Sequence, residues 1–214
     1  MKKTAIQIVK EYNLEHYFRL IWNCPNLNLP YHNLEHLVGV MILVHEACQY
    51  HEIDKVTTRL LLIAALFHDY DHTGVMGDDS VNINRAVKAL TLYIAEKDYK
   101  HFQQIQSYIR ATEFPHAVIV HAANDENLPL YIMRDADTAY TLNERWMQSV
   151  IGIGIEMGLG IANMPALQEK MLKMQEPFMT KVMTFSTEWA KEKYKDIIEQ
   201  RLTEVRDMIS VLYP

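Results

Sequence analysis

Apolar residues recur every three or four positions along most of this chain, the spacing that lines up one face of an α-helix. Residues suited to cap a helix N-terminus, such as Asp54, Ser80 and Asp98, precede several of these stretches. The one notable β-branched cluster, AVIV at 117–120, fits a helix equally well. We therefore predict helices over residues 4–22, 33–51, 55–69, 80–97, 99–112, 128–140, 142–158, 165–184 and 188–212.

The breaks between these helices carry residues that favour turns. Segment 23–30, NCPNLNLP, contains two prolines and three asparagines, and segment 71–79 contains two glycines. Segment 113–127 is partly irregular because it contains a proline and the polar run HAANDEN. Because no repeat, linker or shift of composition divides the chain, we predict one all-α domain over residues 1–214, built as a helical bundle.

Composition and charge narrow the class of protein. The chain has 214 residues, of which 49% are hydrophobic and 22% charged, enough apolar material for one globular core. The net charge of -6 argues against an extended nucleic acid as partner. A small anionic substrate stays compatible with this charge, because a bound metal ion reverses the local field.

The termini, apolar runs and cysteines favour a cytoplasmic protein. The N-terminal MKKTAIQIVKEY is a poor signal peptide because Lys10 and Glu11 interrupt its apolar stretch. The apolar run at 60–67 is too short to span a membrane, so no membrane partner is expected. Cys24 and Cys48 lack metal-type spacing and are expected to be reduced thiols, with a single disulfide as the alternative. The sequence leaves a homo-oligomer open.

The stretch LLLIAALFHDYDHTG offers the first candidate chemistry. Its apolar run ends in the adjacent pair His68 and Asp69, and His72 follows one helical turn later. A buried charge without a partner is costly. A divalent metal accepts imidazole nitrogen and carboxylate oxygen together. The alternative, a histidine stabilised at a helix C-terminus, leaves the carboxylate and His72 unexplained, so we predict metal ligands here.

Two further segments contain residues that could complete such a site. His32 and His36, in YHNLEH, lie four positions apart and share one helix face. They are either two ordinary histidines or a metal ligand with a proton donor beside it. Asp135 and Asp137, in IMRDADTAY, either pair with Arg134 or supply a carboxylate that points inward to the metal.

The order of these motifs resembles the ligand signature of the HD-domain phosphohydrolase superfamily. The local sequences are closest to the catalytic domains of class I cyclic-nucleotide phosphodiesterases. YHNLEH resembles their YHNxxH motif, ALFHDYDHTG resembles their HDxDHxG motif, and IRATEFPH and KMQEPF resemble two later segments. RWMQSVIGIGIEMG is similar to their tryptophan-bearing helix that ends in glycine. The matches follow in order from about residue 31 to 190.

The resemblance implies an enzyme that hydrolyses a phosphodiester of a cyclic nucleotide with two divalent metals. The tight metal is usually Zn²⁺, with iron or manganese as alternatives, and the second is usually Mg²⁺ or Mn²⁺. Asp69 would bridge both metals and His32 would be the general acid. The remaining implied residues are the other tight-site ligands His36, His68 and Asp137, the water-holding His72, Thr112 and His116, and the substrate-binding Gln175, Phe178 and Tyr140.

Three other functions remain as alternative hypotheses to a cyclic-nucleotide phosphodiesterase. The first is another HD hydrolase, acting on a nucleoside monophosphate, a triphosphate or a guanosine polyphosphate. The second is an HD-type di-iron oxygenase, which needs more histidine ligands, for which His101, His116 and His121 are available. The third is a sensor that binds without turnover.

The chain departs from the phosphodiesterase pattern at several positions. The glutamate that usually follows the HD loop is missing from SVNINRAV, where Asn82 lies. The aspartate after the first ligand histidine is replaced by Gly39. Tyr140 occupies the place of an asparagine that helps to read the base, and the chain is shorter than those domains. We therefore expect differences at the second metal and in base selection.

Overall fold

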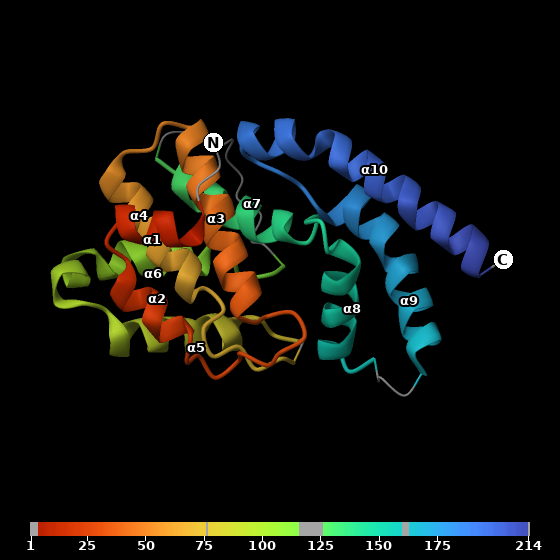
Figure 1. Ribbon diagram of the computed structural model, residues 1–214, viewed down its shortest axis with the longest axis horizontal. Coiled ribbons are helices and arrows are strands. Elements are labelled where there is room, and N and C mark those ends of the chain that lie inside the picture. The colour runs from red at the N-terminus through yellow and green to blue at the C-terminus, as the bar shows by residue number, and fades with distance from the viewer. Residues whose placement is uncertain (1–3, 76, 116–125, 160–162, 214) are drawn as a thin grey trace.

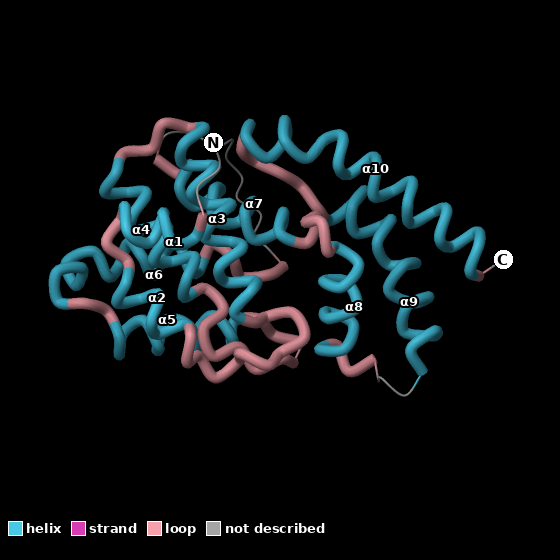
Figure 2. Tube along the Cα trace, viewed as in Figure 1, coloured by secondary structure: helices cyan, strands magenta, loops and turns pink. Residues whose placement is uncertain are grey.

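The computed structural model describes residues 4–75, 77–115, 126–159 and 163–213, and all regular secondary structure in these ranges is helical (Figures 1 and 2). This confirms the predicted all-α class. The helices are α1 (Ala5–Glu11), α2 (Glu15–Ile21), α3 (Leu34–Tyr50), α4 (Lys55–Phe67), α5 (Ser80–Tyr93), η1 (Glu96–His101), α6 (Phe102–Arg110), α7 (Leu128–Tyr140), α8 (Trp146–Glu156), α9 (Met164–Pro177), η3 (Phe178–Val182) and α10 (Glu188–Leu212).

Helix α4 lies at the centre of the bundle. Every side chain from Leu60 to Phe67 is buried. Helices α2, α3, α5, α6 and α7 all contact α4. A helix that is apolar on all sides is stable only when other elements surround it. The unbroken apolar run in the sequence therefore reflects this central position, and it ends where the candidate ligands begin.

Helices α8, α9 and α10 lie on one side of the bundle (Figure 1). Helix α9 packs against α8 and α10, and α10 returns to contact α3 and α7. One hydrophobic core runs from Ile8 in α1 to Val205 in α10. In the part of the chain that the structure describes, no helix combines the length and apolarity needed to cross a bilayer.

The predicted helix over 4–22 is wrong in one respect, because it is divided into α1 and α2. Asn13 lies between them with φ of 53°, in the left-handed region that asparagine tolerates better than most residues. The Leu14 N–H donates to the Val9 carbonyl at 2.9 Å, which closes the turn. The break lets both short helices bury their apolar faces in the same core.

The predicted N-caps Ser80 and Asp98 do not occupy the cap positions of helices. Ser80 is the first residue of α5, and Asp79 occupies the cap position. Asp98 is buried within η1, where the Tyr17 hydroxyl donates to it at 2.7 Å and Arg59 forms an ion pair with it. A buried carboxylate is stabilised by such partners, so tertiary contacts determine its position.

Several other helix boundaries also differ from the prediction. Helix α5 ends at Tyr93, and the predicted helix over 99–112 consists of the end of η1 and α6. Helix α8 begins at Trp146, and the predicted helix over 165–184 consists of α9 followed by the short π-helix η3. The Met183 N–H donates to the Phe178 carbonyl at 2.8 Å and closes η3. The β-branched cluster at 117–120 falls outside the described residues.

Candidate metal centre

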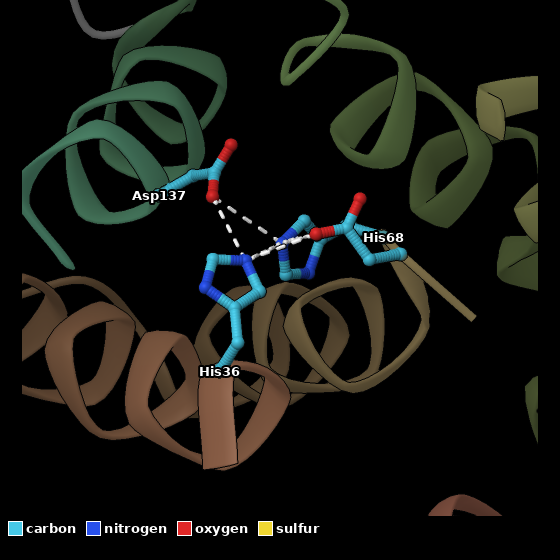
Figure 3. Close-up of side chains that lie close together, drawn as sticks. His36, His68 and Asp137 are labelled. Carbon is cyan, nitrogen blue, oxygen red and sulfur yellow. Dashed lines mark hydrogen bonds and ion pairs between the residues drawn. The ribbon is translucent and has the colours of Figure 1, made fainter. Parts of the chain in front are cut away.

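Three packed helices bring the four predicted ligands together. His36 lies in the first turn of α3, His68 caps the C-terminus of α4 with Asp69 directly after it, and Asp137 lies in α7. Helices α3, α4 and α7 contact one another in all three pairs. Figure 3 shows the side chains of His36, His68 and Asp137 pointing toward one point from different helices. The start of α3 is fixed by Asn33, whose side-chain oxygen accepts from the His36 N–H at 3.2 Å.

The nitrogen and oxygen atoms of these residues that could bind a metal lie close to one another. His36 Nε2 is 3.0 Å from His68 Nε2 and 2.9 Å from Asp69 Oδ2. It is also 3.2 Å from Asp137 Oδ1. His68 Nε2 lies 3.1 Å from Asp69 Oδ2 and 3.4 Å from Asp137 Oδ1. Two imidazole nitrogens and two carboxylate oxygens thus face a common centre.

This spacing fits ligands around one divalent ion. Ligand atoms about 2.1 Å from a metal lie about 3.0 Å apart at right angles and about 3.4 Å apart in a tetrahedron. The two nitrogens also approach to 3.0 Å, a contact that a shared proton or a shared cation explains. The four residues can therefore hold a metal. Mixed nitrogen and oxygen donors suit zinc, iron or manganese.

Hydrogen bonding prepares His68 for this role. Its Nδ1–H donates to the Ala65 carbonyl at 2.9 Å, so Nε2 is the ring nitrogen left for a ligand. Burial lowers the pKa of His68, but the charges of Asp69 and Asp137 and the hydrogen bonds to both together outweigh burial, and the pKa lies well above its usual range. The adjacent carboxylates thus attract positive charge to this point, whether a proton or a metal ion.

His36 is positioned mainly by packing. Its Nδ1 is buried and has no hydrogen-bond partner among the described residues. The ring of Tyr140 stands edge-on to the His36 ring, with 4.8 Å between centroids. Tyr140 reaches this place because Gly39 has no side chain: a Cβ there would lie 2.0 Å from Tyr140 Cε2. The Gly39 departure in the sequence is therefore matched by a tyrosine that fills the space beside the ligand.

His32 pairs with a carboxylate that the sequence analysis did not single out. Glu156, the last residue of α8, forms an ion pair with His32 Nδ1. It also accepts from the backbone N–H of Tyr31 at 2.7 Å and of His32 at 3.1 Å. Burial lowers the pKa of His32, but the charge of Asp69 and the hydrogen bond to Glu156 outweigh burial and raise it. His32 is therefore prepared to carry a proton.

His72 stacks on His32, with ring centroids 3.7 Å apart. Its Nδ1 accepts from the Gly74 N–H at 3.0 Å. Burial and the positive charge of His32 lower the pKa of His72 to about 4. A neutral ring whose Nδ1 accepts carries its proton on Nε2. Although His72 lies close enough to His32 and Asp69 to share a cation, this tautomer makes it a hydrogen-bond donor.

A pocket of about 200 Å³ opens beside these groups. Further polar residues in its lining are Asp79, Asn82 and Thr112. The large apolar and aromatic residues in its lining are Tyr31, Phe114, Ile153, Phe178, Val182 and Met183. Of the residues predicted from sequence, those at the pocket are His32, Asp69, His72, Thr112, Asp137 and Phe178.

Other predicted residues lie elsewhere. Gln175 is buried in α9 and its amide donates to the Met171 carbonyl at 3.2 Å, away from the pocket lining. Tyr140 borders neighbouring hollows and not this pocket. His116 and His121 fall outside the described residues, and His101 lies on η1, outside the metal cluster.

Glu156 and Asp79 are the carboxylates at the site that sequence reasoning missed. Glu156 ends the otherwise apolar run IGIGIE, and a single acid at such a place was a usable signal. Asp79 accepts from the Phe114 N–H at 2.9 Å, and burial together with the charge of Asp69 raises its pKa. The polar loop around Asp79 gave no comparable signal.

Comparison with known proteins supports the fold. No protein-family model matches the chain, and no curated protein matches it by sequence. The chain shares its fold with solved structures, one of which is the Leishmania protein LmjPDEB1 in complex with IBMX, with a TM-score of 0.63 and 13% sequence identity. The similarity covers 98% of this chain and 92% of that one.

Proposed function

We propose that this protein is a metal-dependent phosphohydrolase that opens the phosphodiester of a cyclic nucleotide. The observation that carries the proposal is the convergence of two imidazole nitrogens and two carboxylate oxygens beside the His32–Glu156 pair, at one pocket. A metal cluster without the proton donor would fit many functions. A cluster with a proton donor fits hydrolysis with a poor leaving group.

The ligand set would hold two ions. His36, His68, Asp69 and Asp137 would hold the tight one, as Zn²⁺ or as iron or manganese, and Asp69 would share the second, Mg²⁺ or Mn²⁺. When bound, such ions supply an acidified water as nucleophile and offset the charge of the phosphate. His72 and Thr112 would hold water next to them, and His116 stays a prediction.

His32 would act as general acid. The departing ribose oxygen is a poor leaving group unless it gains a proton as the bond to phosphorus breaks. The Glu156 carboxylate occupies His32 Nδ1 and stabilises the charged ring, so the Nε2 proton is the one available for transfer. The ring ends the step neutral and regains a proton from solvent.

The apolar residues that line the pocket would bind the base. Phe178 lines it, and stacking of a base on an aromatic ring is worth about 1–3 kcal/mol. Gln175 would need a different rotamer to reach a base edge, because its amide bonds within its own helix. Tyr140 contacts His36 and would act on the metal ligand. Base selection by Gln175 or Tyr140 stays a prediction.

A product screen with Mn²⁺-loaded protein tests the proposal. The panel contains cyclic mononucleotides, cyclic dinucleotides, and linear nucleoside mono- and triphosphates. We expect release of a monophosphate from a cyclic substrate. Asp69→Asn should lower the rate by at least about 100-fold, because one ligand charge is lost. Asp207→Asn, an exposed change on α10, is the control and should leave the rate unchanged.

Other outcomes would reject the proposal. Exclusive turnover of linear nucleotides would identify a different HD hydrolase. Tight nucleotide binding without any product would identify a sensor. Oxygen uptake by iron-loaded protein would identify an oxygenase. Full activity of Asp69→Asn would show that the cluster is not the active site.

A further inference from the structure

Asn26 hydrogen-bonds to the backbone of both His32 and Asp69, two residues of the candidate site. It lies in the loop between α2 and α3, yet its side chain is only 3% exposed. Its Nδ2 donates to the His32 carbonyl at 2.5 Å and to the Asp69 carbonyl at 2.9 Å. Its Oδ1 accepts from the Asp71 N–H at 3.0 Å. Both amide protons and the amide oxygen are therefore engaged.

These three contacts join two segments that lie outside the helices, one before α3 and one after α4. His32 precedes α3, whereas Asp69 and Asp71 form the turn that follows α4. Asp71 has φ of 66°, in the left-handed region, so this turn is not held by regular structure. Buried backbone groups need partners, and Asn26 supplies one to each segment.

We propose that Asn26 is a positioning residue that fixes the backbone of the proton donor His32 relative to the metal ligand Asp69. The inference rests on the proposed function for the roles of those two residues. Glu156 orients the His32 ring through Nδ1, and Asn26 holds the His32 carbonyl. Together they set the distance from proton donor to metal.

The side-chain chemistry required here is specific to asparagine. Two donors and one acceptor must leave the same short side chain. Aspartate has the same shape but only accepts, so it would place a carboxylate oxygen against two carbonyl oxygens. Asn26→Asp therefore tests the contacts without creating a cavity. Asn23→Asp is the matched control, because Asn23 is exposed in the same loop and, among the described residues, its side chain bonds only to the Arg19 carbonyl, at 3.3 Å.

The experiment compares two substrates at saturating Mn²⁺. A cyclic nucleotide releases an alkoxide that needs a proton, whereas bis(p-nitrophenyl) phosphate releases a phenolate that does not. A misplaced general acid should lower kcat on the cyclic nucleotide by about 30-fold or more, with KM nearly unchanged. The loss on the nitrophenyl ester should be less than about 3-fold, since it needs no acid. Asn23→Asp should match the wild type on both.

A double substitution asks whether Asn26 acts through His32. In a His32→Ala background, Asn26→Asp should cause no further loss on the cyclic nucleotide, because the acid is already gone. Equal losses on both substrates, or an undiminished loss in that background, would overturn the proposal in favour of a general structural role.

Mn²⁺ titration separates this inference from the proposed function. If the wild type turns over neither substrate, the proposed function has failed, and Mn²⁺ binding alone then tests Asn26. Asn26→Asp should raise the Kd for Mn²⁺ by at least about 3-fold, since the Asp69 backbone loses its partner. A Kd equal to that of the wild type would overturn the positioning role.

Discussion

At the scale of single residues, the site depends on partners that set protonation. Asp69 and Glu156 favour the charged form of His32, while burial and the positive charge of His32 keep His72 neutral. His32 and His72, whose stacked rings lie 3.7 Å apart, thus differ in protonation: His32 favours the charged form and His72 the neutral form. Groups whose environments separate their pKa values in this way can serve as acid and as neutral donor side by side.

Glu156→Gln tests this division of roles. A general acid works only while protonated, so kcat/KM falls as pH rises through the pKa of His32. Glu156 raises that pKa, and its neutral replacement should move the alkaline limb of the profile to lower pH. The rate on a cyclic nucleotide should fall by about 10-fold or more.

The measurement is a pH–rate profile of kcat/KM, with Glu199→Gln, an exposed change on α10, as control. An alkaline limb that stays in place in Glu156→Gln would show that His32 does not titrate under the influence of Glu156.

The sequence pointed to the four candidate metal ligands more clearly than to Glu156 and Asn26, the residues that contact them or their neighbours. His36, His68, Asp69 and Asp137 stood out because charged groups beside apolar runs require an explanation. The structure brings all four together. Glu156 and Asn26 act through distant contacts, and a local pattern contains no information on which loop a side chain will meet.

At the scale of elements, close packing between helices positions the ligands. Gly39 of α3 admits the ring of Tyr140 from α7, and that ring packs on His36. Gly152 of α8 lets this helix approach the Pro30 carbonyl, where a Cβ would lie at 2.7 Å, one turn before Glu156. Two glycines thus allow the approach of helices that carry site residues.

Gly39→Ala should separate α3 from α7. The added methyl would meet Tyr140 Cε2 at 2.0 Å, and overpacking of this kind costs about 1–3 kcal/mol. Displacement of Tyr140 should also weaken metal binding at His36. Denaturant unfolding and Zn²⁺ titration measure the two effects.

The double variant Gly39→Ala, Tyr140→Ala provides the control. Removal of the ring makes room for the methyl, so the two free-energy losses should sum to more than the loss in the double variant. Additive losses would show that the glycine and the tyrosine are independent.

At the scale of the whole molecule, helical periodicity predicted the class of fold and most of its elements. It missed the division between α1 and α2, because a single left-handed Asn13 decides it. It also missed the role of Asp98, which is determined by Tyr17 and Arg59. Tertiary contacts override local propensity at such positions.

The fold is shared with LmjPDEB1 at only 13% identity. Such a low identity is compatible with one architecture, because packing of apolar faces fixes the bundle while many sequences satisfy it. The shared fold therefore shows the architecture alone, and the chemistry must be argued from the side chains.

The most direct test of the central claim is the metal content of the purified protein. We expect the wild type to retain at least about one equivalent of Zn²⁺, iron or Mn²⁺ per chain after dialysis, since two imidazole nitrogens and two carboxylate oxygens together bind a divalent metal tightly. Asp137→Asn should lose most of it, and Asp207→Asn should retain it. A wild type that binds no divalent metal, or an Asp137→Asn variant that binds as much, would contradict the account.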